Sequence, residues 1–293
     1  MTMKKKTYIL YAILAAVLYA ISTPLSKLLL NELSPTMIAG LLYMGAGLGM
    51  SIVGYIRMKT TNHTYKKFTK DELPHILGMI VLDIIAPIML MIGLKTSLPE
   101  NVALLNNFEI VATSLLAAFI FKEVIPRRLR LAIIFVTLAS IILTVDDLSA
   151  FTFSLGSLFV LLAAISWGLE NNLTRKLSVN DPLMVVVIKG IFSGLGSLMI
   201  AFFLGEFSLN VTYILMTLAL GFVAYGLSIF FYVTAQRELG AAKTATFYAF
   251  APFVGVCLSL IIFQDIPQLN FFIALILMGL GSYFASTEKR INA

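Results

Sequence analysis

The sequence contains very few of the residues on which metal, redox and nucleophilic chemistry depend. Its 293 residues include one cysteine and two histidines. The single cysteine, Cys257, excludes an intrachain disulfide, and its apolar surroundings predict a small buried packing residue. His63 and His75 have no partners at a metal-like spacing. We therefore expect no bound metal, no cofactor and no catalytic residues.

Motifs of phosphate-binding and hydrolytic enzymes are also missing. There is no P-loop, no HExxH sequence and no Ser/His/Asp set. ATP-driven transport within this chain is therefore not expected. An integral-membrane enzyme acting on lipid-type substrates is an alternative, but it would need clustered acidic or histidine ligands. The acidic pair Asp146-Asp147, in a predicted extracytoplasmic loop, has no such companions.

Charge is scarce too, since 12% of the residues are charged and 59% are hydrophobic. The mean hydropathy of +0.96 indicates an all-α polytopic membrane protein, because a soluble domain would be more polar. About 20 apolar residues cross a bilayer, and ten such stretches can be placed. These predicted spans, numbered one to ten, are Thr7–Leu30, Pro35–Ile56, Leu73–Leu94, Leu98–Phe121, Leu129–Val145, Ser154–Leu177, Pro182–Leu204, Tyr213–Ala235, Ala241–Phe263 and Leu269–Ser286.

The basic residues predict the orientation of these spans. Of the 21 lysines and arginines, all but Lys27, Lys95 and Lys189 fall at or near one side of the membrane. The positive-inside rule then makes both termini cytoplasmic in the cell membrane. The net charge of +6 is explained by this topology, so we expect the bilayer as a partner and no nucleic acid.

Two parts of the chain recur at constant spacing. Ala15–Lys27 aligns with Ala163–Arg175, and Thr96–Glu123 aligns with Glu238–Asp265. The sequence therefore predicts two related halves, residues 1–150 and 151–293. Each half has five spans, an odd number, so the second half must insert in the opposite sense. Inverted repeats of this kind are typical of alternating-access transporters.

With these features the chain resembles the EamA-type branch of the drug/metabolite transporter superfamily. The resemblance covers the ten spans, the two halves, and the span ends IGLKTSLPENVALL and FYVTAQRELGAAKTATF. It implies a central cavity lined by spans one, three, four, six, eight and nine. It also implies transport of small metabolites, without indicating which ones.

Acidic residues inside the spans are candidates for proton coupling. A carboxylate at the bilayer centre costs roughly 2.5–3.5 kcal/mol, so it must face protein or water. Asp83 and Glu109 lie equally far in sequence from Thr96, where spans three and four turn, and are expected at the same depth. Two such carboxylates cannot both ionise cheaply, so a proton or a cation should be shared there. A structural hydrogen-bonding role is the alternative for either.

A polar stripe and several aromatic side chains are candidates for binding the substrate. In span six, Trp167, Glu170, Asn171 and Thr174 share one helix face. Aromatic rings around a negative interior would suit a cationic or zwitterionic amine, although each ring could serve packing alone. The predicted substrate-binding residues are Tyr19, Asn106, Trp167, Glu170, Asn171, Tyr225, Tyr232 and Tyr248. Tyr225 aligns with Asp83 of the first half.

Several alternatives stay open at this level. Glu170 either pairs with Lys189 or faces the substrate. Lys27 and Arg175 are expected to extend to the membrane surfaces. The GxxxG sequence Gly190 to Gly194 predicts close helix packing or a dimer face, so a monomer or a weak homodimer is expected. A carrier of a neutral metabolite, or a channel or scaffold, is an alternative to the amine carrier.

Overall fold

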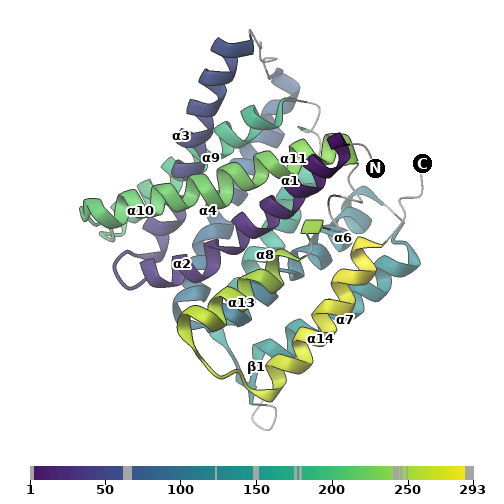
Figure 1. Cartoon of the computed structure of the whole chain (residues 1–293). Coiled ribbons are helices and arrows are strands. Elements are labelled where there is room, and N and C mark those ends of the chain that lie inside the picture. Colours follow the sequence, from purple (N-terminus) through teal and green to yellow (C-terminus); the bar gives the residue numbers. More distant parts are fainter. Residues whose placement is uncertain are drawn as a thin grey trace.

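A computed structural model of the chain describes residues 3–61, 68–122, 124–147, 152–174, 177, 180–239, 244, 247–248 and 250–287. Helices dominate it (Figure 1). In the first half they are α1 (Met3–Ala20), α2 (Ser22–Leu29), α3 (Pro35–Thr61), η1 (Lys70–Glu72), α4 (Leu73–Thr96), α5 (Pro99–Leu105), α6 (Phe108–Phe121) and α7 (Arg127–Thr144). In the second half they are α8 (Leu155–Thr174), α9 (Pro182–Phe203), α10 (Val211–Gly221), the π-helix η3 (Phe222–Leu227), α11 (Ser228–Leu239), α13 (Ala251–Phe263) and α14 (Leu269–Ser286).

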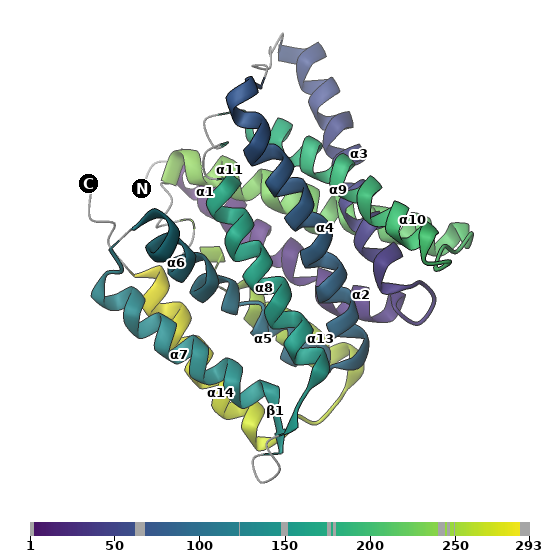
Figure 2. The same ribbon diagram turned by 180° about the vertical axis from the view of Figure 1, so that it is seen from behind.

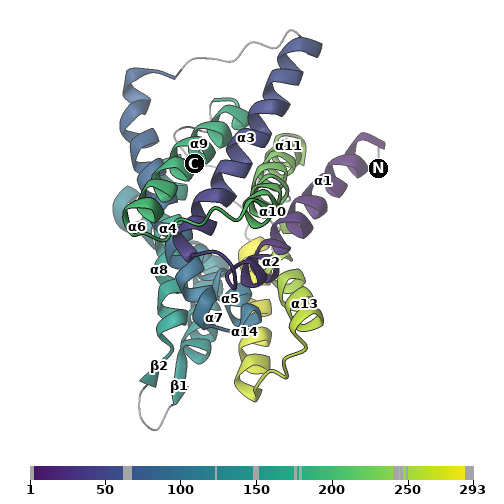
Figure 3. The ribbon, with the colours of Figure 1, turned by 90° about the vertical axis from the view of Figure 1, so that its left-hand side faces the viewer.

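One short antiparallel ribbon joins α7 to α8 and so connects the two predicted halves. Its strands are β1 (Val145–Asp147) and β2 (Thr152–Phe153), and Val145 pairs with Phe153. The backbone of Asp146-Asp147 therefore belongs to a strand instead of the predicted loop. The ribbon lies at the opposite end of the molecule from the start of α4 (Figure 3).

Seven helices within the described residues are long and apolar enough to cross a membrane by themselves. They are Lys6–Leu29, Pro35–Thr60, Lys70–Thr96, Pro99–Ile120, Pro182–Phe203, Val211–Tyr232 and Leu269–Ser286, and α13 is a shorter apolar helix. Neither α7 nor α8 belongs to this set. The first turn of α7 carries Arg127, Arg128 and Arg130, and α8 ends in a polar stretch around Glu170. The chain is therefore a predominantly helical, multi-pass membrane protein.

Helices from distant parts of the sequence lie side by side. On the face seen in Figure 2, α8 packs against both α4 and α6. Towards the outside, α1 runs along α11 and α7 along α14 (Figure 1). Since α1, α4, α6 and α7 belong to the first half and their partners to the second, the halves are interleaved. Each half therefore supplies walls to the same interior.

Small residues pack α3 closely against α9. A Cβ atom on Gly190 would lie 2.5 Å from the backbone nitrogen of Gly47, and one on Gly194 would lie 2.6 Å from the backbone nitrogen of Met44. The contacting residue numbers decrease along α3, from Gly47 to Met44, as they increase along α9, from Gly190 to Gly194. The two helices are therefore antiparallel. The GxxxG sequence therefore packs inside the chain, and its glycines are not available as a dimer face.

Several spans are interrupted near the middle of the fold. The first helix breaks at Ile21, between α1 and α2, three residues before Pro24. The fourth predicted span breaks at Asn106 and Asn107, between α5 and α6, and the eighth contains the π-helix η3. Pro252 lies in the first turn of α13, where its missing N–H removes no hydrogen bond of that helix. Pro87 lies inside α4, which continues through it.

Cys257 corrects another expectation. It was predicted to be a buried packing residue, but its side chain is exposed on α13. Exposed apolar residues of the same helix, such as Ile261, share this surface. In a membrane protein the apolar surroundings of a residue in the sequence do not distinguish the protein interior from the lipid-facing side.

Candidate functional site

A chain of polar side chains connects four helices in the interior. The indole Nε1 of Trp167 on α8 donates to the hydroxyl of Tyr43 on α3, at 3.2 Å. The Tyr43 hydroxyl in turn donates to Oδ1 of Asp83 on α4, at 2.8 Å. All three residues are buried, and Asp83 has no exposed surface. A carboxylate at this depth needs partners, and the tyrosine hydroxyl is one of them.

Lys189 on α9 is the second partner of Asp83. Its Nζ lies 3.1 Å from Asp83 Oδ2 and 3.4 Å from Oε1 of Glu170 on α8. Glu170 also accepts a hydrogen bond from Thr174. Of the two alternatives for Glu170, the structure has the pairing with Lys189, but the closer contact of this lysine is with Asp83. Two carboxylates around one ammonium leave the cluster one positive charge short of neutrality.

Glu109 forms a separate contact on the other side of α8. Asn171 Nδ2 donates to Glu109 Oε1 at 2.6 Å and lies 3.4 Å from the Thr113 hydroxyl. Close approach of α6 and α8 makes this possible, because a Cβ on Gly168 would lie 2.5 Å from that of Ala112. Asp83 and Glu109 therefore bind different partners, and the predicted sharing of one site by the two carboxylates is not what the structure has. Asp83 contacts Tyr43 on α3 and Lys189 on α9, whereas Glu109 contacts Asn171 on α8.

The predicted aromatic residues form one continuous row. Tyr43 lies 5.5 Å from Tyr225, measured between ring centroids, and Tyr225 lies 5.9 Å from Tyr19. Tyr19 lies 5.9 Å from Tyr248, which lies 4.8 Å from Tyr232. Through Tyr43 and Trp167 this row joins the charged cluster. Four helices, α1, α3, α8 and α11, and the π-helix η3 thus contribute polar or aromatic groups to one interior region.

A small cavity of about 10 Å³ lies where the interrupted helices meet. It is lined by Tyr19 and Thr23 beside the first break, Asn106 at the second, and Pro252 at the start of α13. Asn106 Oδ1 is buried and has no hydrogen-bond partner among the described residues. This volume is close to that of one water-sized probe, so this cavity holds nothing larger than a water molecule.

The structure assembles the predicted residues into three neighbouring groups. Trp167, Glu170 and Asp83 belong to the charged cluster, and Glu109 and Asn171 form their own pair. Tyr19, Tyr225, Tyr232 and Tyr248 form the aromatic row, and Asn106 lines the small cavity beside Tyr19. Sequence reasoning missed Tyr43 and treated Lys189 only as a partner of Glu170. Both come from spans two and seven, which the resemblance did not include among the cavity walls.

Lys27 has a different environment from the one predicted. Its Nζ donates to the carbonyl oxygens of Leu94 at 2.7 Å, Lys95 at 3.1 Å and Ser97 at 2.8 Å. The ammonium thus caps the carboxyl end of α4, where the helix dipole favours a positive charge. The side chain does approach the end of its span, as expected, but protein carbonyls bind it there. Arg175 lies outside the described residues.

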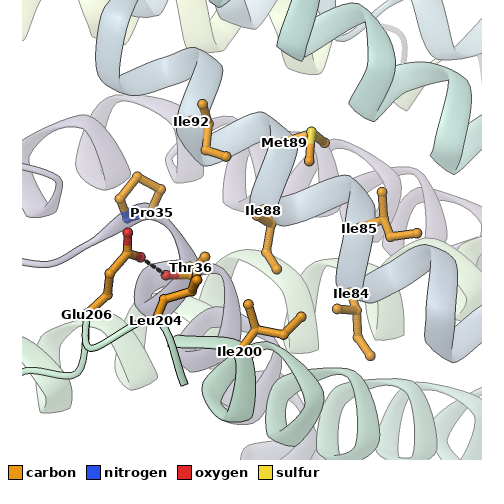
Figure 4. A pocket seen from close by; sticks show the side chains of 10 residues that line it. All are labelled: Pro35, Thr36, Ile84, Ile85, Ile88, Met89, Ile92, Ile200, Leu204 and Glu206. Carbon is orange, nitrogen blue, oxygen red and sulfur yellow. Dashed lines mark hydrogen bonds between the residues drawn. The ribbon is translucent and has the colours of Figure 1, made fainter. Parts of the chain in front are cut away.

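A larger cavity, of about 310 Å³, lies on the outer surface between α3, α4 and α9 (Figure 4). Four isoleucines and Met89 of α4 form one side of it, and none of the predicted site residues lines it. Among the described residues no group of three histidine, cysteine or acidic side chains is suited to hold a metal ion. The interior chemistry is therefore that of carboxylates, one ammonium and aromatic hydroxyls.

Comparison with known proteins agrees with this arrangement. A curated "Uncharacterized transporter" of Methanothermobacter thermautotrophicus is 26% identical over 270 residues, which cover 86% of this chain and 78% of the relative. The "Uncharacterized transporter YyaM" of Bacillus subtilis is 25% identical over 210 residues, 68% of each protein. A solved crystal structure with 18% identity covers 98% of both chains with a TM-score of 0.68, which shows the fold alone.

The family comparison covers nearly the whole chain and matches it twice. Residues 6–145 and residues 154–287 each fit the model of the EamA-like transporter family. The two matches meet near the ribbon of β1 and β2. A transporter family and transporter relatives agree with an interior of paired charges that lacks catalytic motifs. This chain is therefore a member of the EamA-like transporter family, a transporter and not an enzyme.

Proposed function

We propose that the protein is a secondary active transporter that couples protons to a small organic cargo, preferably a cationic or zwitterionic amine such as an amino-acid-like metabolite. The observation that carries this proposal is the buried cluster of Asp83, Lys189 and Glu170. Its excess of one carboxylate must be balanced, because an unpaired charge inside a membrane protein is costly. A proton and a cationic cargo can balance it in turn, which is the exchange that coupling requires.

Glu109 is suited to a second step of proton transfer. It binds Asn171, whose side chain is exposed, whereas Asp83 is fully buried. Glu109 therefore has easier access to protons from outside the interior than Asp83 has. We infer that Glu109 loads the proton and that Asp83, through Lys189, links its release to the cargo.

The aromatic row favours an organic ammonium over a neutral cargo. Tyr225 and Tyr19 lie edge to face, and Tyr225 also lies beside Tyr43, which binds Asp83 directly. Ring faces next to a carboxylate attract ammonium groups, each contact giving roughly 0.5–2 kcal/mol. A neutral metabolite would use the same rings but would leave the excess carboxylate uncompensated.

Two oppositely inserted halves, residues 1–150 and 151–293, would give this cluster alternating access. The contacts of α3 with α9 support such a symmetry. Met44 contacts Gly194, and Gly47 contacts Ile191. The sequence spacing from Met44 to Gly47 in the first half equals that from Ile191 to Gly194 in the second. Asp83 and Tyr225, which align between the halves, both contact Tyr43. Interrupted helices at α1/α2, α5/α6 and before α13 are also typical of such sites.

We infer further that α7, α8 and the region of α13 cross the bilayer as well, giving ten spans in the cell membrane with both termini cytoplasmic. The distribution of basic residues over the loops supports this orientation. Because the glycines of α9 pack against α3, we expect a monomer or, at most, a weak homodimer.

Uptake into proteoliposomes tests the function. A thermal-shift screen of the purified protein against amines, amino acids and neutral metabolites first selects a cargo. An imposed pH gradient should then drive its uptake. Glu109→Gln should abolish the response to the gradient while the protein still inserts and remains monodisperse, because the amide keeps a partner for Asn171 but cannot titrate.

Glu32→Gln is the matched control, since Glu32 is an exposed acid in the loop after α2 and should leave uptake unchanged. Full gradient-driven uptake by Glu109→Gln would contradict the proton role. Rapid ion flux without a gradient would favour a channel, and a cargo set without amines would favour the neutral carrier.

A further inference from the structure

The groove on the outer surface has a well-defined shape and position. One wall is a row of α4 side chains that includes Ile84, Ile88 and Ile92, and the other is formed by Ile200 and Leu204 near the end of α9 (Figure 4). Its volume is about 310 Å³. Leu204 is 61% exposed, so the groove is open to its surroundings. Around a membrane-spanning helix those surroundings are lipid acyl chains.

One end of the groove is polar, and the structure fixes that end firmly. Gly205 adopts a left-handed conformation with φ of 69°, and the N–H of Glu206 donates to the carbonyl of Ala201 at 2.9 Å. This Schellman motif ends α9 and holds Glu206 beside α3. There the Thr36 hydroxyl donates to the Glu206 carboxylate, and Ser34 Oγ donates to the Glu206 carbonyl at 3.1 Å.

The opposite end of the groove is apolar and lies deep in the membrane. Ile84 follows the buried Asp83 and packs on α9, where a Cβ on Gly196 would lie 2.3 Å from the Ile84 Cδ1. From Ile84 to Ile92 the helix rises about 12 Å, close to the ~15 Å of one leaflet's hydrocarbon. The groove is therefore polar at the membrane surface and apolar towards the midplane, as a phospholipid is.

Two charges at or near the polar end favour one type of head group. Glu206 provides a carboxylate in the lining of the groove. Lys95 is not a lining residue, but it provides an exposed ammonium in the last turn of α4, three residues after the lining residue Ile92. A zwitterionic head group with a phosphate and a primary ammonium complements this pair. A trimethylammonium head group carries the same charge but cannot donate hydrogen bonds to a carboxylate.

We propose that this groove is a binding site for a phospholipid with a primary-ammonium head group, of the phosphatidylethanolamine type. One acyl chain lies against the isoleucines of α4, and the ammonium binds Glu206. Because α4 belongs to the first half and Glu206 to the second, the bound lipid bridges the two halves. This site requires only the membrane location of the chain, so it stands or fails separately from the proposed transport mechanism.

Lipid retention by the purified protein tests the site. The protein is reconstituted in nanodiscs of equal parts phosphatidylethanolamine, phosphatidylcholine and phosphatidylglycerol, released into mild detergent, and examined by native mass spectrometry. We expect phosphatidylethanolamine to be retained in preference to the other two. Glu206→Gln should reduce this preference about two- to fivefold, the range of an exposed ion pair. Glu32→Gln changes an exposed acid that does not line the groove, so it should leave the preference for phosphatidylethanolamine unchanged.

The acyl chain is tested by filling the groove from its open side. Ile85→Trp should reduce retention of all three lipids, whereas Ile273→Trp, at a similarly exposed position on α14, should not. Glycerophosphoethanolamine, which has no acyl chains, should not displace the lipid. Unchanged head-group preference in Glu206→Gln, unchanged retention in Ile85→Trp, or displacement by the chain-free head group would each overturn the proposal.

Discussion

Lys189 is held between two acidic side chains inside a membrane-spanning region, and this arrangement dominates the energetics of the interior. Its ammonium contacts Asp83 at 3.1 Å and Glu170 at 3.4 Å, and both carboxylates are buried. Removing one member of a buried ion pair leaves an uncompensated charge, which costs more than the pair contributes. The lysine is therefore expected to matter for stability as well as for transport.

Substitution of the lysine should show this imbalance directly. Lys189→Met should lower the free energy of unfolding by about 3–5 kcal/mol, because Asp83 and Glu170 lose their common counter-ion. The double variant Lys189→Met with Asp83→Asn should recover part of that loss, since one buried charge disappears with its partner. Thermal unfolding of the detergent-purified variants measures both. A single variant as stable as the double would mean that the cluster is not a coupled unit.

Tyr43 connects the charged cluster to the only tryptophan of the chain. Tyr43→Phe keeps the ring against Tyr225 but removes the donor to Asp83 and the acceptor for the Trp167 indole. We expect a loss of about 1.5–3 kcal/mol in stability, the range for a hydrogen bond to a charged group. We also expect a shift of the Trp167 emission maximum, because the indole N–H loses its partner. An unchanged spectrum together with unchanged stability would exclude these hydrogen bonds.

At the scale of single helices, the sequence predicted positions better than it predicted interruptions. Each predicted span is largely helical within the described residues. Pro24 lies just beyond the break at Ile21, because a proline cannot donate to the preceding turn. The break at Asn106 and Asn107 and the π-helix at Phe222–Leu227 have no comparable local signal. They depend on how neighbouring helices pack, which a single sequence does not contain.

The packing of α3 on α9 gives a prediction at this scale. Gly190→Ala places a Cβ 2.5 Å from the backbone nitrogen of Gly47, and backbone atoms cannot move aside as a flexible side chain can. The helices must separate, at a cost of about 1–3 kcal/mol. Gly279→Ala is the matched control, because the nearest atom to its Cβ is Phe253 Cζ at 4.0 Å. That variant should keep or slightly raise the melting temperature. Equal effects of the two substitutions would contradict the contact.

At the scale of the whole molecule, residue type alone was enough to predict the acidic members of the candidate site. Which residues lie next to them is known only from the folded structure. Asp83, Glu109 and Glu170 were recognisable because lipid makes intramembrane acids costly. Tyr43 was not, since an isolated tyrosine in a glycine-rich apolar helix has no distinguishing pattern. The separation of Asp83 from Glu109 was also out of reach, because equal depth in a hairpin does not fix which neighbouring helix each side chain faces. The packing of α4 against α3 and α9, and of α6 against α8, decides that.

The central claim is that two oppositely inserted halves enclose the charged cluster. Equivalent loops of the two halves must then lie on opposite sides of the membrane. Single cysteines at Asp71, in the loop between α3 and α4, and at Leu209, in the loop between α9 and α10, are both exposed and can be tested in a Cys257→Ser background. The measurement is labelling of intact cells by a membrane-impermeant maleimide. If the halves are oppositely inserted, Leu209→Cys is labelled on intact cells and Asp71→Cys reacts only after the cells are opened. Labelling of both from the same side would contradict opposite insertion of the halves.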